Sequence, residues 1–245
     1  MHEQLWFTEK LNHLFAGPVT AMLETLRIHP HDPHNPITDP VAMQIVVAFL
    51  LLAFFLAVRA RLSVDDPGKI QHAAEMIHEM IAGQSEEIIG HEHKRFVPYL
   101  VTIGLFIVVS NLLGLIPGFL SPTQFPSVPL GFALATFAYY HFHGFRQQGF
   151  VHYMKHFAGP VPWLAPLMFP IEIISHSARI MSLTIRLYAN MYAGEMVTLA
   201  FFSLVPIVLP VMFLGLHLGV SLLQAYIFVL LTMIYLSGAV AEEEH

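Results

Sequence analysis

Long apolar runs alternate with shorter polar segments along the first two thirds of this chain. Residues 41–58 form an uncharged apolar run, close to the roughly 20 residues that a helix needs to span a bilayer. Two further apolar runs cover residues 96–115 and 130–142, the second continuing to about residue 145. The pattern predicts a membrane-spanning helix over each of these three runs.

Two other segments have apolar residues at helical spacing among many polar ones. Residues 1–18 have a partly apolar side, and residues 66–91 repeat isoleucine and alanine three or four apart among Glu, His and Gln. Such patterns are typical of amphipathic helices that lie on a membrane surface. Between them, residues 27–40 contain four prolines, which are excluded from a helix interior, and we expect a loop there.

The last third of the chain has a different pattern. Residues 168–191 have a helical pattern. Gly194 and Glu195 follow it and are predicted to mark the join to the next apolar run. Residues 196–240 are nearly uncharged and would extend about 67 Å as one helix, over twice the thickness of a bilayer core. Either Pro206 and Pro210 divide this run into two spans, or one long helix lies strongly tilted.

These runs predict the organisation of the whole chain. We expect an all-α membrane protein with about five membrane helices plus amphipathic surface helices. Residues 1–40 form an N-terminal amphipathic helix and an outside loop, and residues 41–160 form membrane helices 1–3 with the surface helix at 66–91. Residues 161–245 form a tilted helical hairpin with a polar stripe inside the membrane.

Composition supports a membrane protein and excludes several kinds of site. The 245 residues are 56% hydrophobic and 11% charged, against about 25% charged in soluble domains. The net charge of −6 with 11 Lys and Arg argues against nucleic-acid binding, and the lack of cysteine excludes disulfides and thiolate metal sites. Most of the 16 histidines lie in loops or at helix ends, so we expect no metal and no cofactor. No phosphate loop, nucleophile elbow or zinc-protease motif predicts catalysis by this chain alone.

The distribution of basic residues predicts the orientation in the membrane. With the N-terminus outside and the C-terminus cytoplasmic, seven basic residues face the cytoplasm, as the positive-inside rule requires. They are Arg59, Arg61, Lys69, Lys94, Arg95, Arg146 and Lys155. The N-terminal segment lacks the pattern of a cleavable signal, which favours a bacterial plasma (inner) membrane.

Charged residues recur inside the penultimate apolar segment. Glu172, Arg179 and Arg186 are seven residues apart and therefore lie nearly on one helix face, with His176 and Asn190 on the same side. An arginine at the centre of a membrane helix costs roughly 2.5 to 3.5 kcal/mol, so such residues indicate a functional site. Glu172, His176 and Arg179 have an alternative interpretation, a position near the interface.

A second polar face follows in the final segment. His217, Ser221 and Gln224 have the spacing that places all three on one face of a helix. Two helices with such stripes are expected to pack antiparallel with protonatable groups between them. Two alternatives are a secondary transporter with Arg186 as a substrate counter-ion and a cytochrome, for which only His176 and His217 qualify as intramembrane ligands.

Three sequence runs resemble one family. They are SLTIRLYANMYAGE at 182–195, LQAYIFVLLTMIYLS at 223–237 and NLLGLIPG at 111–118, and they are similar to the a subunit of F-type ATP synthases. The resemblance implies a stator subunit that faces a ring of c subunits, together with b-type peripheral stalk subunits, and that conducts protons through the lipid bilayer.

The resemblance also implies roles for individual residues. Arg186 matches an arginine between two offset half-channels, and the matching proton-path positions are Asn190, Glu195, His217 and Gln224. We expect supporting roles for the remaining polar residues of the two stripes, which are Glu172, His176, Arg179 and Ser221. Tyr188 and Ala189 depart from the Phe and Gly of many relatives. A guanidinium stays charged, so Arg186 can hold a carboxylate ionised without passing a proton itself.

Overall fold

The prediction of an all-α protein is confirmed. The computed structural model describes residues 5–25, 35–63, 68–90, 92–116, 118–149, 153, 165–204 and 208–240, and these ranges contain helices and no strand. The α-helices are α1 (Trp6–Thr25), α2 (Asp39–Ala60), α3 (Lys69–Ile89), α4 (Val97–Leu113), α5 (Ser127–Gln148), α7 (Ala165–Leu204) and α8 (Val208–Val240). Two short 3₁₀ helices are η1 (His93–Arg95) and η2 (Pro122–Gln124).

The predicted N-terminal helix is present and is longer than expected. α1 continues past Pro18 to Thr25, and the exposed side chains of Leu14 and Phe15 lie on one side of it. Asn12 fastens the buried side, because its side chain exchanges two 2.9 Å hydrogen bonds with the backbone N–H and C=O of Ile37. α1 is therefore attached to the segment that leads into α2.

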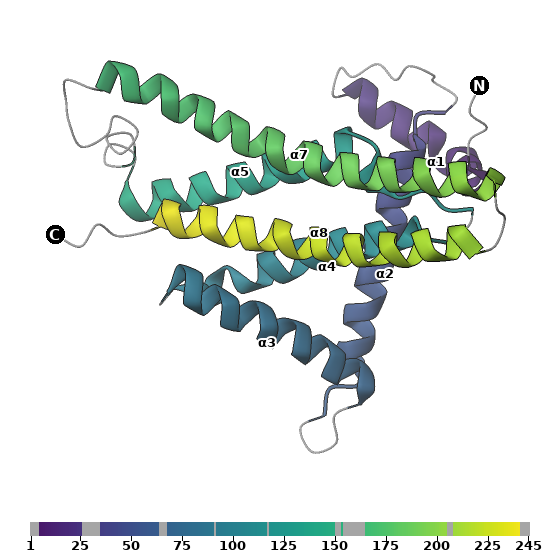
Figure 1. The fold of residues 1–245 in the computed structure, drawn as a ribbon, viewed down its shortest axis with the longest axis horizontal. Helices are drawn as coiled ribbons and strands as arrows, with labels where there is room; N and C mark the ends of the chain where they lie inside the picture. Colours follow the sequence, from purple (N-terminus) through teal and green to yellow (C-terminus); the bar gives the residue numbers. More distant parts are fainter. Residues whose placement is uncertain are drawn as a thin grey trace.

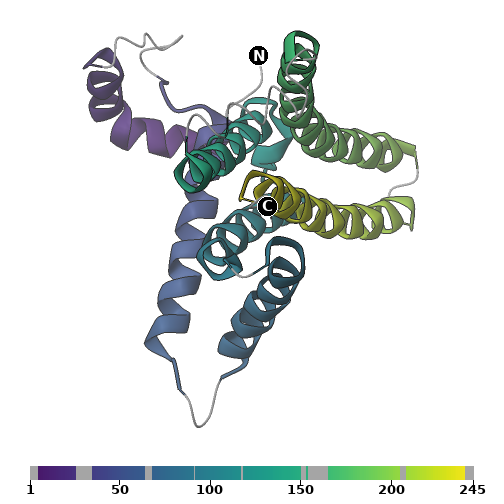
Figure 2. The same ribbon diagram turned by 90° about the vertical axis from the view of Figure 1, so that its left-hand side faces the viewer.

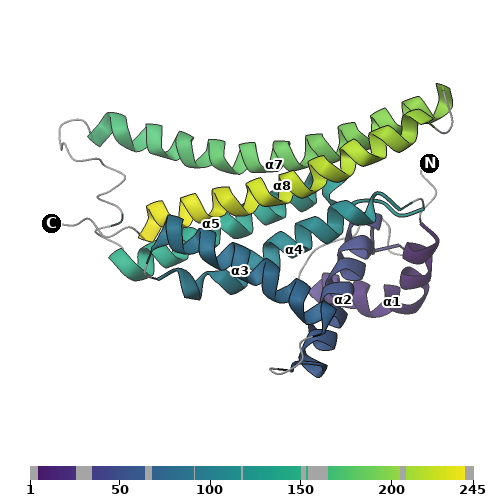
Figure 3. The same cartoon turned by 60° about the horizontal axis from the view of Figure 1, so that its bottom comes forward.

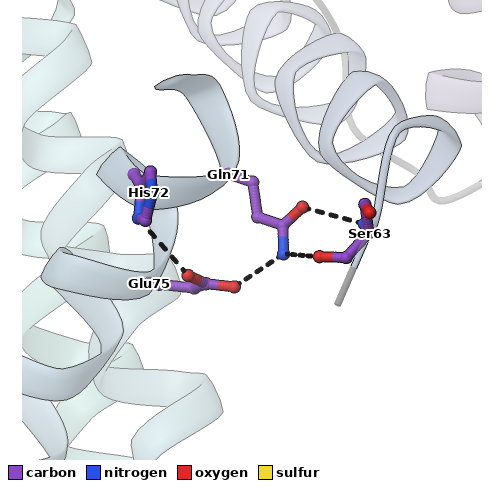
Figure 4. Close-up of polar contacts among 4 residues, drawn as sticks. All are labelled: Ser63, Gln71, His72 and Glu75. Atoms are coloured by element: carbon purple, nitrogen blue, oxygen red, sulfur yellow. Dashed lines mark hydrogen bonds and ion pairs between the residues drawn. The ribbon is translucent and has the colours of Figure 1, made fainter. Parts of the chain in front are cut away.

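α2 contains the more apolar of the two stretches that are long enough to cross a membrane, and Pro40 lies in its first turn, where a missing N–H leaves no helix bond unmade. Gln71 of α3 holds the end of this helix (Figure 4). Its side-chain oxygen accepts from the Ser63 N–H at 3.0 Å, and its amide donates to the Ser63 carbonyl at 2.9 Å and to Glu75 at 2.8 Å. These bonds fix where the chain leaves α2 and where the surface helix α3 begins.

The core lies among α4, α5, α7 and α8, and α3 covers one side of it. Fully buried residues from three of these helices include Leu100, Leu187 and Phe228. Figures 1 and 2 show these four helices running in broadly similar directions, with α2 crossing them. A second, smaller core joins Met43 and Val47 of α2 to Leu113 of α4. The crossing helix is therefore packed on one end of the bundle.

α7 and α8 form a long antiparallel hairpin (Figure 3). α7 has 40 residues and α8 has 33, which correspond to about 60 Å and about 50 Å of helix. The predicted join at Gly194 and Glu195 is wrong, because α7 runs through both residues to Leu204. A single glycine inside a helical pattern is tolerated at a cost of about 1 kcal/mol relative to alanine, so its presence did not mark an end. The hairpin is instead joined by residues 205–207, which include Pro206 and lie outside the described residues, as does the side chain of Pro210.

The other predicted helices occur where the hydrophobic pattern placed them. The surface helix at 66–91 is α3, and the second and third apolar runs are α4 and α5, the latter extending about three residues beyond the predicted run at each end. In the described residues, two helical stretches are long and apolar enough to cross a membrane, Asp39–Ala60 and Val211–Val240. The count of about five membrane helices and the division at 40 and 160 stay predictions.

Candidate functional site

Glu172, Arg179 and Arg186 lie at heptad spacing on the unbroken helix α7, and therefore nearly on one side of it. Because α7 is unbroken, Glu172 lies about 21 Å before Arg186 along the axis and Glu195 about 14 Å after it. The three positions are thus spread over more than a bilayer thickness of helix, with the arginine between the two acids. The neighbouring helices α5 and α8 decide which partners each position meets.

Glu172, His176 and Arg179 lie together with Tyr140 of α5, and we name these four residues the Glu172 cluster. His176 is 7% exposed and has a partner on each ring nitrogen: Glu172 Oε1 is 3.3 Å from Nε2, and the Tyr140 hydroxyl is 2.9 Å from Nδ1. A neutral imidazole satisfies both contacts by donating from Nε2 and accepting at Nδ1. Arg179 lies over the ring of Tyr235 on α8, 5.0 Å from its centre, as a cation–π pair.

A small cavity of about 130 Å³ adjoins the Glu172 cluster. Its walls include Tyr153, whose hydroxyl lies 2.8 Å from Nδ1 of His141, one residue after Tyr140. Burial raises the pKa of Tyr153 to about 12, so its hydroxyl remains a donor at neutral pH. The cavity is therefore bordered by groups that donate or accept protons, and it is large enough for water.

Arg186 has few partners within the chain. Its guanidinium donates to the Ser182 hydroxyl at 3.2 Å, one turn earlier on the same helix. In the part of the chain that the structure describes, no carboxylate forms an ion pair with it. Ile185 beside it is 53% exposed. A charge on a largely apolar exposed face is thus left without an anion from its own chain.

Asn190, Glu195, His217 and Gln224 follow on the other side of Arg186, and we name them the His217 cluster. The Asn190 amide donates to the Gln224 side-chain oxygen at 2.8 Å, which links α7 directly to α8. Gln224 is buried, whereas Glu195 and His217 are half-buried. Among the described residues, Nε2 of His217 is shielded from solvent and has no hydrogen-bond partner.

Gly194 allows α8 to approach α7 at the His217 cluster. A Cβ built on this glycine would lie 2.9 Å from both Cε1 and Nε2 of the His217 imidazole. The ring therefore packs on the bare backbone of α7, next to Glu195. A larger side chain at position 194 would displace the imidazole.

Ser221 belongs to the predicted face of α8, but it does not join either cluster through its side chain. It is fully buried, and its hydroxyl contacts the Met191 sulfur at 3.9 Å. Its backbone carbonyl accepts from the amide of Asn111 on α4 at 3.3 Å. The serine is a point of contact between three helices.

Sequence reasoning missed three residues that build the site. Tyr140, Gly194 and Asn111 meet the polar residues only through the packing of α5 on α7, of α7 on α8 and of α4 on α8. Asn111 lies within a run already noted as similar to a family, which was a signal of importance without a role. Nothing in the pattern around Tyr140 distinguished it from its neighbour Tyr139.

Metal binding has no geometric support in the described residues, among which no group of three or more His, Asp or Glu side chains could hold an ion. The histidine-rich residues 29–34 lie outside the described ranges.

The matches to known proteins include the residues of this site. A family described as "ATP synthase A chain" matches residues 41–237, which include both clusters and Arg186. A protein named ATP synthase subunit a from Koribacter versatilis is 57% identical over 241 residues, covering 98% of each chain. The chain belongs to the ATP synthase subunit a family.

Other members of this family are also similar to most of the chain. ATP synthase subunit a of Solibacter usitatus is 51% identical over 232 residues, 95% of this chain and 99% of the relative. The Helicobacter pylori (strain P12) protein of the same name is 44% identical over 201 residues, 81% and 89% of the two chains. Membership in the subunit a family confirms the resemblance on which the sequence-based identification depended.

Proposed function

We propose that this chain is the proton-conducting stator subunit in the membrane sector of an F-type ATP synthase. One observation carries the proposal: Arg186 lies between two polar clusters and has no carboxylate partner among the described residues of its own chain. A buried or membrane-embedded cation requires an anion to offset its desolvation. In a subunit of a larger complex, that anion can come from a neighbouring subunit.

The partner that fits this requirement is a ring of c subunits, each with one carboxylate at membrane depth. A guanidinium is charged at every physiological pH, so it favours the ionised form of a carboxylate that reaches it. The same fixed charge repels a proton that would pass directly along the helix. Protons must then travel on the ring, and their flow is coupled to its rotation and to ATP synthesis elsewhere in the complex.

The helix lengths support a tilted hairpin in the bilayer. α2 has a length of about 33 Å and matches a bilayer core of about 30 Å when it stands upright. α7 is nearly twice as long and crosses the direction of α2 (Figure 1), so the hairpin lies strongly inclined. An inclined helix can pass along the side of a ring and present polar groups at several depths.

The two clusters fit two offset aqueous half-channels. The His217 cluster serves the outer side, where Glu195 and His217 exchange protons and the Asn190–Gln224 pair holds the two helices together. The Glu172 cluster and its cavity serve the cytoplasmic side. This arrangement assumes the orientation with the N-terminus outside, the C-terminus cytoplasmic and b-type stalk subunits beside the chain, in a bacterial inner membrane.

The experiment that tests the proposal is Arg186→Ala in membranes that contain the assembled complex. ATP-driven acidification of inverted vesicles, followed with a pH-sensitive dye, is expected to fall at least about a hundredfold, since the charge that holds the ring carboxylate ionised is gone. ATP hydrolysis and the amount of assembled complex are measured in the same vesicles.

Arg179→Ala is the matched control, because it removes the same side chain from the same helix face. Arg179 lies against Tyr235, and its loss is expected to leave measurable pumping. Normal pumping by the Arg186 variant would exclude the proposed role.

A further inference from the structure

A buried polar link connects the segment between α4 and α5 to the backbone of α8. Thr123 in η2 donates its hydroxyl to the Asn111 side-chain oxygen at 2.6 Å. The Asn111 amide in turn donates to the carbonyl of Ser221 at 3.3 Å. All three residues are 0% exposed, so both hydrogen bonds are shielded from water. The amide of Asn111 thus bridges two parts of the chain that are about a hundred residues apart.

Two close contacts hold this link in place. Gly114 lies against Ser121, where an added Cβ would be 2.6 Å from the serine Cβ, so the segment folds tightly onto the end of α4. Gly104 lies against Val229 of α8 in the same way, at 2.8 Å. α4 and α8 therefore meet at two points, Gly104 with Val229 and Asn111 with Ser221, which are about 10 Å apart along α4.

α8 needs a directional contact to set its position along its axis. Its surface is almost entirely apolar, and packing between apolar side chains tolerates small shifts because it has no preferred direction. A shift of one residue moves a helix by 1.5 Å along its axis, enough to break the 2.8 Å bond between Asn190 and Gln224. A hydrogen bond to a backbone carbonyl fixes the axial position whatever the side chain is.

We propose that Asn111 is a positioning residue that holds α8 in register against α7 by linking Thr123 to the α8 backbone at Ser221. Ser221 lies between His217 and Gln224, so the register at this point sets where both proton-path groups meet α7. The functional consequence rests on the proton path proposed above. Asn111 itself carries no proton in this scheme, because an amide does not titrate in the accessible range.

Disulfide formation between α7 and α8 measures the register directly, since the chain has no cysteine of its own. Met191→Cys with Ser221→Cys places thiols at two side chains now in contact at 3.9 Å and leaves the backbone carbonyl in place. Phe201→Cys with Phe213→Cys, at two rings stacked 4.5 Å apart nearer the end of the hairpin, reports whether the hairpin has formed at all.

The variants separate the two halves of the link. In the assembled complex, Asn111→Leu is expected to slow the 191–221 cross-link about fivefold, the ratio that corresponds to one lost hydrogen bond. Thr123→Val is expected to slow it less, and the 201–213 cross-link stays as in the parent. Thr136→Val is the matched control, because this equally buried hydroxyl bonds to Tyr99 at 3.1 Å and lies off the link.

Asn111→Asp is expected to make pumping depend on pH in a way that a loss of packing would not. The aspartate can donate to the Ser221 carbonyl only while its carboxyl is protonated. Relative to the parent at the same pH, pumping by Asn111→Asp is therefore expected to decline as the pH rises, whereas Asn111→Leu pumps slowly throughout.

Two results would overturn the proposal: an unchanged 191–221 cross-link in Asn111→Leu, or an equal effect of Thr123→Val and Thr136→Val. Failure of the proposed proton path is distinguishable, because cross-linking does not depend on proton flow. In that case Arg186→Ala would still pump while the cross-linking result stands.

Discussion

The Glu172 cluster lies toward one end of the α7–α8 hairpin, and Arg186 and the His217 cluster lie farther along it, and the two parts differ in how fully their side chains are partnered. His176 has a partner on each nitrogen, and Arg179 lies over an aromatic ring. Within the described residues, Arg186 bonds only to Ser182, and His217 has a buried nitrogen with no hydrogen-bond partner. Histidine and arginine thus find their partners within the chain in one part of the hairpin, whereas in the other the described residues supply no anion to the arginine and no partner to the histidine Nε2.

The difference indicates which groups interact with something outside this chain. A buried polar group without a partner costs about 1 to 3 kcal/mol, so it persists where water, a moving ion or a second subunit supplies the missing contact. A fully partnered group is held in one position and serves to shape its surroundings. On this basis we propose that Arg186 and His217 interact with groups outside this chain, and that Arg179 is mainly structural.

The largest effect after loss of Arg186 is expected from Gly194→Val. The new side chain would occupy the space of the His217 imidazole, because even a Cβ lies 2.9 Å from the ring. ATP-driven pumping in vesicles is expected to fall by about tenfold or more, which corresponds to about 1.4 kcal/mol or more in the barrier to proton transfer. Gly131→Val on α5 is the control, since nothing lies within 4 Å of its added Cβ. Equal losses in both variants would mean that the ring's place on α7 is unimportant.

A smaller effect is expected when exchange groups are neutralised without a change of shape. Glu195→Gln removes a titratable group and is expected to slow proton flux several-fold, since an amide cannot take up and release a proton. His217→Ala removes the imidazole ring as well as its titratable nitrogens, and it is expected to act in the same direction.

Glu172→Gln makes the identical change in the partnered region. Its amide oxygen can still accept from Nε2 of His176, now 3.3 Å from the carboxylate, so we expect less loss than at Glu195. Flux measured against pH in vesicles compares the two variants. A larger loss at Glu172 than at Glu195 would reverse the assignment of exchange and support.

The smallest effect is expected from Tyr140→Phe. This change removes the 2.9 Å hydrogen bond to Nδ1 of His176 and leaves a buried acceptor, at about 1 kcal/mol of stability. Pumping is expected to persist, while the complex inactivates at a lower temperature. Tyr226→Phe is the control, because its hydrogen bond to Gln84 is exposed and should matter less. Complete loss of pumping in Tyr140→Phe would place this tyrosine among the exchange groups.

Much of the fold could be predicted because hydrophobic periodicity reports local helix formation. The five helices from α2 to α7 that correspond to predicted runs begin and end within a few residues of the expected limits, except at the C-terminal end of α7. The prediction failed at Gly194 and Glu195 because a single glycine inside a long helix need not end it. Its role is to admit His217, which no local pattern can show.

The site could be predicted only as two stripes. Heptad spacing placed Glu172, Arg179 and Arg186 on one face, and the resemblance to a family added the expected roles on α8. Spacing could not indicate that Asn190 meets Gln224 or that Tyr140 meets His176, because these contacts join helices from distant parts of the chain.

The sequence by itself determined the helices, the polar faces and membership in the family, since each depends on neighbouring residues or on direct similarity. Only the tertiary structure decided which polar side chains have a partner within the chain. Arg179 contacts Tyr235 because α8 packs beside it, and His176 contacts Tyr140 because α5 packs beside it, whereas Arg186 bonds only to Ser182 of its own helix among the described residues. Whether a polar side chain reaches a partner depends on the distance between two helices. That distance depends in turn on close contacts such as that of Gly194 with His217 and that of Asn111 with Ser221.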